Sequence, residues 1–110
     1  MILTVLVSAG ARFGIYAHTR LARKHGLSDA KIAAVVAGRR PPDLSIQEAI
    51  AYDLAASLCK AGPVPETIYR RAVEAFGQET LLALVFVVGN FKMIGTILNA
   101  FDEPLPAEDA

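Results

Sequence analysis

Two histidines and several basic and aromatic side chains fall within residues 12–26, and these are the residues of the chain best suited to chemistry. His18 follows Tyr16 by two residues, and Arg12 and Arg20 lie on either side of it. An imidazole donates and accepts protons near neutral pH, which suits general acid–base catalysis. On spacing alone, such a histidine is more often a structural residue with a satisfied ring.

His25 lies seven residues beyond His18, on about the same helix face but roughly 10 Å along the axis. The two rings are too far apart to bind one metal ion without a third element. Because the sequence also lacks HxxxH, HExxH and paired cysteines, we predict no metal site. His25 is simply explained by the helix dipole. The patch formed by Arg20, Arg23 and Lys24 is either a solvated face or a site for a carboxylate or phosphate.

The composition limits the classes of partner. Eleven basic and eleven acidic residues give a formal net charge of zero, which does not favour nucleic acid. The one cysteine, Cys59, cannot form an internal disulfide and indicates a reducing cytoplasm. The apolar N-terminus lacks the basic flank of a secretory signal. The apolar run at 81–88 is interrupted by Asn90 and Lys92 before the roughly 20 residues of a membrane span. We therefore expect a cytoplasmic protein without a membrane partner.

Apolar periodicity and Gly and Pro breaks predict an all-α single domain over residues 1–110, a bundle of about five helices. The helical segments are predicted at 1–7, 11–25, 29–37, 46–60, 66–76 and 78–101. Ser28 is the predicted N-cap of the third segment, and Ser45 with Glu48 forms a predicted capping box. Gly77 separates the last two segments. The final segment is apolar all round, which predicts a central, mostly buried helix. An acidic, proline-containing tail occupies 102–110.

Further expectations concern individual side chains on these helices. The buried stripe of the second helix is predicted to consist of Phe13, Tyr16 or Ala17, and Leu21. Asp53 lies on an apolar helix and is expected to pair with a basic side chain. Polar groups on a buried helix need partners, so we interpret Asn90 and Lys92 as residues of a subunit interface.

The motifs around His18 resemble those of a known family. They are Phe13-x-x-Tyr16-Ala17-His18, Leu21-Ala22-Arg23-Lys24-x-Gly26-Leu27-Ser28, Ala37-Gly38-Arg39, Leu44-Ser45-x-x-Glu48 and Leu98-Asn99-Ala100-Phe101-Asp102-x-Pro104-Leu105-Pro106. This series is similar to the carboxymuconolactone decarboxylase family, whose all-helical fold is shared with the alkylhydroperoxidase D proteins. The resemblance covers nearly the whole chain. It implies an N-terminally shortened member, corresponding to the C-terminal two-thirds of a typical one.

The resemblance aligns His18 with the motif histidine of the family. In thiol-active relatives a Cys-x-x-Cys pair precedes this histidine, and Ala11 and Gly14 stand at those two positions here. Decarboxylase-like members often carry a glutamate at the second position, from which Gly14 also departs. The acidic proton-relay residue of the family lies upstream of the motif, and residues 1–11 contain no acid. The chain therefore resembles a member without the family's thiols.

The first functional hypothesis implied by the resemblance is a cofactor-independent lyase of aromatic-compound catabolism that decarboxylates a small lactone acid. His18 is expected to donate the proton and Tyr16 to orient the ring or substrate. Arg12 or Arg20 is expected to bind the carboxylate.

The second hypothesis is a non-catalytic, truncated or drifted oligomeric paralogue. Under both hypotheses the family implies a homo-oligomer, a trimer or hexamer, and the apolar excess agrees with buried intersubunit surface. The third, alkylhydroperoxidase activity, follows from the family label alone because the thiols are missing.

Overall fold

The computed structural model describes residues 1–101 and 104–105, and all regular structure in this part of the chain is helical. The five helices are α1 (Ile2–Ala9), α2 (Arg12–Lys24), α3 (Asp29–Val36), α4 (Ile46–Leu58) and α5 (Glu66–Phe101). The prediction of an all-α bundle of about five helices is confirmed. Apart from Pro104 and Leu105, the predicted tail at 102–110 lies outside the described residues.

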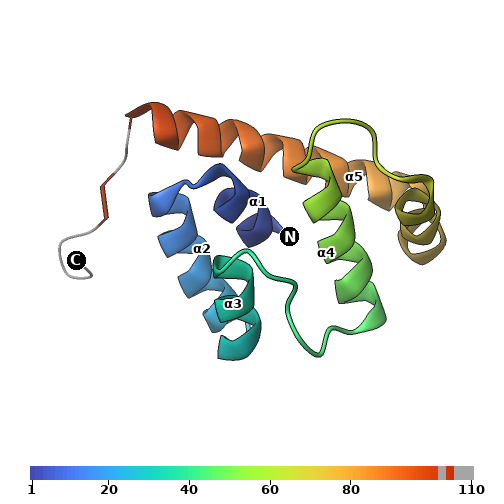
Figure 1. The fold of residues 1–110 in the computed structure, drawn as a ribbon, viewed down its shortest axis with the longest axis horizontal. Coiled ribbons are helices and arrows are strands. Elements are labelled where there is room, and N and C mark those ends of the chain that lie inside the picture. The colour runs from blue at the N-terminus through green and yellow to red at the C-terminus, as the bar shows by residue number, and fades with distance from the viewer. Residues whose placement is uncertain (102–103, 106–110) are drawn as a thin grey trace.

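The helices are arranged around α1, which contacts each of the other four. Figure 1 shows α5 running along one edge of the molecule, with α2 and α3 beneath one end and α4 beneath the other. The largest fully buried side chains, Val5, Leu6, Leu54 and Val88, come from α1, α4 and α5. The core therefore lies where α5 crosses α1 and α4.

Two capping signals that were read from the sequence form the expected bonds. The Ser28 hydroxyl accepts the Lys31 backbone N–H at 3.3 Å. The Ser45 hydroxyl accepts the Glu48 backbone N–H at 3.1 Å, and the Glu48 carboxylate accepts the Ser45 N–H at 3.0 Å. The start of α4 is thus fixed by a complete capping box.

The break predicted at Gly77 is confirmed as a kink within α5. Gly77 has φ 76° and ψ 162°, a combination that a residue with a Cβ adopts only under strain. The kink separates the short arm of α5, which packs on α4, from the long arm that crosses α1 and α2.

An ion-pair network joins the loop before α4 to the short arm of α5. Asp53 on α4 accepts two hydrogen bonds from the Arg40 guanidinium, both at 3.2 Å, and lies 3.6 Å from Arg71 Nη1. The expected basic partner of Asp53 is therefore confirmed, with a second one added. Because these groups are partly exposed, the pairs position the loop more than they stabilise the fold.

The prediction that 78–101 forms a mostly buried helix is wrong for this chain. Leu81, Val88 and Gly95 are the buried residues of that arm, and they share one face. Several large apolar side chains of the same arm are nevertheless exposed, namely Leu82, Val85, Phe86, Met93, Ile97 and Phe101. Three shorter helices, α1, α2 and α4, contact one side of a helix that is 36 residues long, and this leaves much of its other side uncovered. By length and composition α5 also meets the requirements of a membrane span, and 17% of its most apolar 18-residue window is buried.

The predicted stripe of α2 differs from the expectation, and two polar side chains of α5 bond within the chain. The Lys92 ammonium donates to the Leu58 carbonyl at 3.0 Å, and the Asn99 amide donates to the Ala9 carbonyl at 2.7 Å. Lys92 is thus engaged within the chain, whereas Asn90 is exposed. Leu21 is 45% exposed, because the buried contact of α2 is made by Gly14 instead.

Small residues allow α5 to lie directly on the turn between α1 and α2. A Cβ at Gly95 would lie 3.0 Å from the Ala9 Cβ and 3.9 Å from the Ala11 Cβ. A Cβ at Gly14 would lie 2.9 Å from Leu6 Cδ2 and 3.3 Å from Leu98 Cδ1. The two glycines therefore set the distance between α5 and the α1–α2 turn.

We expect Gly95→Ala to destabilise the fold by about 1–2 kcal/mol, the overpacking cost less the gain in helix propensity. Adding Ala9→Gly removes the atom that the new methyl group meets. The double variant should therefore be more stable than the sum of the two single changes predicts, by about 1 kcal/mol. Denaturant unfolding of all four proteins measures this coupling. Purely additive free energies would contradict the close packing of α5 on α1.

Acid should weaken the start of α4. The pKa of Glu48 is lowered from its usual 4.5, first by the Ser45 backbone N–H and then by Lys31, whose ammonium lies 3.3 Å away. A carboxyl group with a lowered pKa stabilises the fold above its usual pKa, and this contribution is lost as the pH falls below 4.5. The stability difference between wild type and Glu48→Gln should therefore shrink on acidification below pH 4.5, as measured by urea unfolding across the pH range. A difference that stays constant down to the lowest pH would contradict this role.

Candidate functional site

The helical repeat of α2 divides the four predicted site residues between two faces. Arg12, Tyr16 and Arg20 follow one another at four-residue steps and form one ridge. His18 is two residues from both Tyr16 and Arg20, which places it about 200° around the helix from them. The structure thus brings Tyr16 and Arg20 together and separates both from His18.

The His18 ring is held by its own helix and by α5. Its Nδ1 lies 3.1 Å from the carbonyl oxygen of Gly14, one turn earlier. Its plane meets the Phe91 ring edge-on, at 81° and with 5.2 Å between the centroids. In the neutral ring, Nδ1–H donates to the carbonyl, and this leaves Nε2 as the proton acceptor. The contacts that hold the ring are thus made by the Gly14 carbonyl and the Phe91 ring.

His18 lines an open groove of about 530 Å³ between the N-terminal part of α1, α2 and the long arm of α5. The described residues that line this His18 groove are Met1, Ile2, Leu3, His18, Leu21, Ala22, His25, Leu27, Leu84 and Val87. The walls are apolar, and the polar side chains among these residues are the two histidines. Histidine 25, interpreted from the sequence as a helix-end residue, thus faces the same space as His18.

The ridge of α2 formed by Arg12, Tyr16 and Arg20, here called the basic ridge, makes contacts away from the groove. The Arg20 Nη1 donates to the Tyr16 hydroxyl at 3.2 Å, and its guanidinium carbon lies 5.5 Å from the centre of the Tyr16 ring. Arg12 is exposed in the first turn and is also engaged in an interaction. Arg23 pairs with Asp29 at 3.0 Å. These contacts explain much of the basic patch as a solvated, internally paired surface.

Comparison with known protein families gives a match to the first half of the chain. Residues 1–57 match the model of the Carboxymuconolactone decarboxylase family, a span that includes α1, α2, α3 and most of α4. The chain belongs to this family. Searches of curated proteins and of solved structures gave no match.

The two positions at which the resemblance places a thiol pair, 11 and 14, lie inside the core. Ala11 is 0% exposed and Gly14 is buried. The close approach of Leu6 and Leu98 leaves no room at Gly14 for the side chain of a cysteine or a glutamate. The cysteine of this chain, Cys59, lies at the end of α4 and packs beside another core cluster. The described residues contain no group of three or more metal-ligating side chains.

Sequence reasoning found His18 but missed the groups that surround it. Phe91 comes from α5, 73 positions later in the sequence, so no local pattern links the two rings. The groove walls Leu84 and Val87 are likewise defined by the way α5 packs. The one local signal was the four-residue spacing between Gly14 and His18, which allows a histidine to bond back to a helix carbonyl.

A side chain with a carboxylate at position 14 should not fit. We expect Gly14→Glu to destabilise the fold by more than about 3 kcal/mol, because the carboxylate would be buried without a partner. Gly14→Ala is the matched control, since its methyl group meets the terminal carbons of the Leu6 side chain rather than backbone, and alanine adds helix propensity of about 1 kcal/mol. Thermal unfolding followed by circular dichroism measures both. A Gly14→Glu protein as stable as Gly14→Ala would contradict the buried packing of this position.

Proposed function

We propose that this protein decarboxylates a small, carboxylated lactone without a cofactor, with His18 transferring the proton. The observation that carries the proposal is the His18 ring in an apolar groove, fixed through Nδ1 so that Nε2 is left for a ligand. A groove of about 530 Å³ falls within the range of pockets for small molecules. Membership of the carboxymuconolactone decarboxylase family supports the reaction class.

The reaction requires one bond to break and one to form. The bond between the carboxylate and the ring carbon breaks, carbon dioxide leaves, and the electron pair passes into the unsaturated lactone. In the protonated form, His18 gives the Nε2 proton to the carbanionic carbon and is then reprotonated by solvent. Apolar walls assist this step, since loss of carbon dioxide spreads the negative charge and is favoured where water is excluded.

The substrate carboxylate needs a cation or a hydrogen-bond donor. In this proposal His25 supplies it, because its side chain lines the same groove as His18. Arg12 and Arg20 were the candidates from the sequence, and they lie on the other ridge of α2. Binding through either arginine would require the substrate to extend around the helix. The two assignments predict different kinetic effects of substituting His25 and Arg20.

A second candidate function is a non-catalytic, oligomeric member of the family. It is favoured by the absence of any acidic side chain among the described residues that line the His18 groove. Without an acid nearby, proton delivery depends on His18 alone. The same measurements distinguish this candidate from the enzyme.

We expect His18→Ala to lower the rate of carbon dioxide release from a panel of carboxylated lactones by about 10²- to 10⁴-fold, the usual contribution of a general acid. The His18 side chain is partly exposed, so the fold should be retained, which circular dichroism checks. His25→Ala should raise KM with a smaller change in kcat, because it removes ground-state binding. Arg20→Ala is the comparison, and in this proposal it leaves both constants near the wild-type values.

Each result has a defined meaning. Unchanged turnover in His18→Ala would overturn the assignment of the proton to this residue. A raised KM in Arg20→Ala but not in His25→Ala would move carboxylate binding to the basic ridge. A folded wild-type protein that turns over none of the lactones would overturn the decarboxylase and favour the non-catalytic member.

A further inference from the structure

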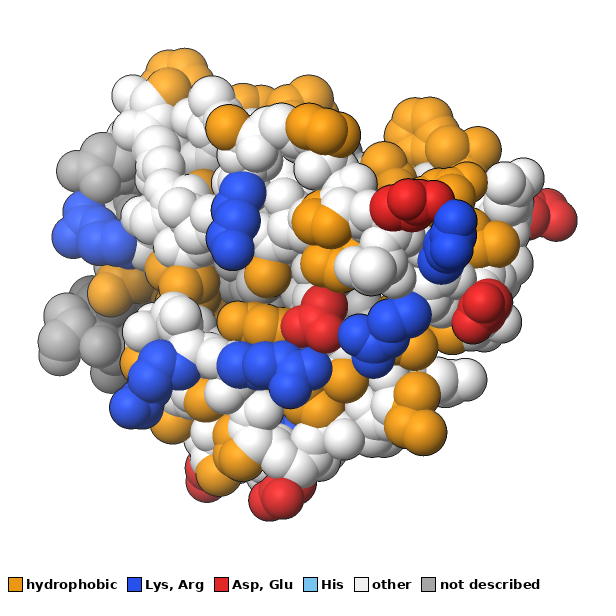
Figure 2. Space-filling view, turned by 45° about the vertical axis from the view of Figure 1, so that its right-hand side comes forward, with side chains coloured by type: hydrophobic (Ala, Val, Ile, Leu, Met, Phe, Trp, Pro, Cys, Tyr) orange, Lys and Arg blue, Asp and Glu red, His pale blue; other side chains and the backbone are white. Residues whose placement is uncertain are grey.

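The long arm of α5 presents a bare apolar face to its surroundings. Leu82, Phe86, Met93 and Ile97 recur at helical spacing, and each is 49–70% exposed. Gly89 lies between Phe86 and Met93, and no atom lies within 4 Å of where its Cβ would be. We call this set the outer face of α5. Figure 2 shows hydrophobic side chains gathered along the upper edge of the molecule, where α5 runs.

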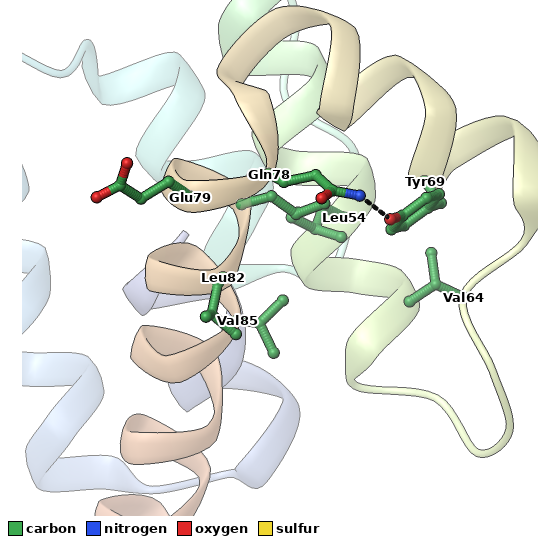
Figure 3. A pocket seen from close by; sticks show the side chains of 8 residues that line it. Leu54, Val64, Tyr69, Gln78, Glu79, Leu82 and Val85 are labelled. Carbon is green, nitrogen blue, oxygen red and sulfur yellow. Dashed lines mark hydrogen bonds between the residues drawn. The ribbon is translucent and has the colours of Figure 1, made fainter.

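Two hollows lie along the outer face and share two of their walls. The first, of about 470 Å³, lies at the kink and is lined by Leu54, Val64, Tyr69, Gln78, Glu79, Leu81, Leu82 and Val85. In Figure 3 the Gln78 amide donates to the Tyr69 hydroxyl at the rim, at 3.1 Å, while the Glu79 side chain points away from them. The second, of about 480 Å³, is lined by Leu82, Val85, Phe86, Gly89, Asn90 and Met93. Because Leu82 and Val85 line both hollows, the two hollows lie next to each other along the helix.

The outer face is uncharged over most of its length. Between residues 78 and 101 the charged side chains are Glu79 and Lys92. Glu79 lies at the kink end, and the Lys92 ammonium is turned back to the Leu58 carbonyl. A partner with a charged surface would find no counter-charge here. The surface that matches an uncharged apolar stripe of this kind is another one like it.

Asn90 identifies that surface as a second copy of the same chain. Its amide lies in the wall of the second hollow, beside Gly89 near the middle of the stripe. Against lipid this amide would lack a hydrogen-bond partner, which is costly. Across a two-fold axis near position 90, each Asn90 amide can donate to and accept from the other. A single polar residue within an apolar helix seam is a known means of fixing register and orientation.

We propose that two copies of this protein associate through the outer faces of α5, antiparallel and centred at Gly89 and Asn90. In this register Phe86 of each copy lies opposite Met93 of the other and fills the hollow beside Gly89. Leu82 lies opposite Ile97. Gly89 allows the helices to approach closely. The exposed side chains supply on the order of several hundred Å² of apolar surface per copy, comparable with the roughly 800 Å² per partner of a standard interface.

This dimer does not rest on the proposed decarboxylation. The His18 groove uses Leu84 and Val87, which are on a different side of α5 from Leu82 and Phe86. Loss of the dimer should therefore leave the His18 ring and its contacts in place. Failure of either proposal is recognised separately, because one is measured by association and the other by turnover.

Sedimentation velocity of the full chain at micromolar to 100 µM concentration tests the association. We expect a wild-type dimer whose Kd rises at least about 100-fold in Phe86→Asp, because a two-fold axis repeats the buried charge. Ile46→Asp is the matched control: Ile46 is 78% exposed on α4, so the same substitution there should leave the dimer intact. A monomeric wild type, or a Phe86→Asp protein that still dimerises, would overturn the proposal. Flotation of the wild type, but not Phe86→Asp, with neutral phosphatidylcholine vesicles would overturn it in favour of a membrane surface.

Disulfide cross-linking tests the orientation in a Cys59→Ala background. Leu82→Cys and Ile97→Cys proteins should form a mixed disulfide when combined under mild oxidation, because antiparallel pairing brings these two positions together. Each protein alone should remain largely uncross-linked. Efficient cross-linking of each single variant with itself would overturn the antiparallel register, since that result requires parallel helices. Mass spectrometry of the linked species distinguishes the two outcomes.

Discussion

The close approach of α5 to the turn between α1 and α2 is the constraint on which the rest of the structure depends. Gly14 and Gly95 make it possible, because a side chain at either position would meet Leu6, Leu98 or Ala9. With the helix at this distance, Val88 reaches the cluster around Val5. The same approach lets the Asn99 amide bond to the carbonyl at the end of α1. A looser crossing would open the core and the His18 groove together.

Gly14 therefore has two roles, and both position the His18 ring. Its carbonyl accepts the Nδ1 proton of His18, and its missing side chain allows α5 to bring Phe91 against the same ring. A thiol or carboxylate at this position would meet Leu6 and Leu98 and would displace α5 and with it Phe91. His18 thus lies in an environment built from packing, and the described residues that line its groove include no acid or thiol. Any chemistry at His18 must then rely on the ring itself and on the apolar walls of the groove.

Local signals in the sequence were sufficient to predict the helices and their ends, but they did not predict the contacts between helices. The Ser45 and Glu48 capping box and the break at Gly77 depend on residues within a few positions of each other, so the sequence alone predicts them. The burial of α5 depends on how many other helices are available to cover it, and an apolar composition does not contain that information. The pairing of His18 with Phe91 and the inclusion of His25 in the groove are tertiary for the same reason. Helical spacing did separate His18 from the ridge of Tyr16 and Arg20, and applying it more strictly would have weakened the expectation that Tyr16 orients the ring.

The two sides of α5 now explain why its sequence is apolar all round. One side carries Leu81, Val88 and Gly95 into the core and supplies walls to the His18 groove. The other carries Phe86 and Met93 outward, where a monomer gains nothing from them and loses solubility. A helix that is apolar only because it packs on a core would show a polar outer face, as α2 does with Arg12, Arg20 and Arg23. In the proposed dimer, the outer face of α5 is covered by the second copy, and Asn90 determines the register in which it is covered.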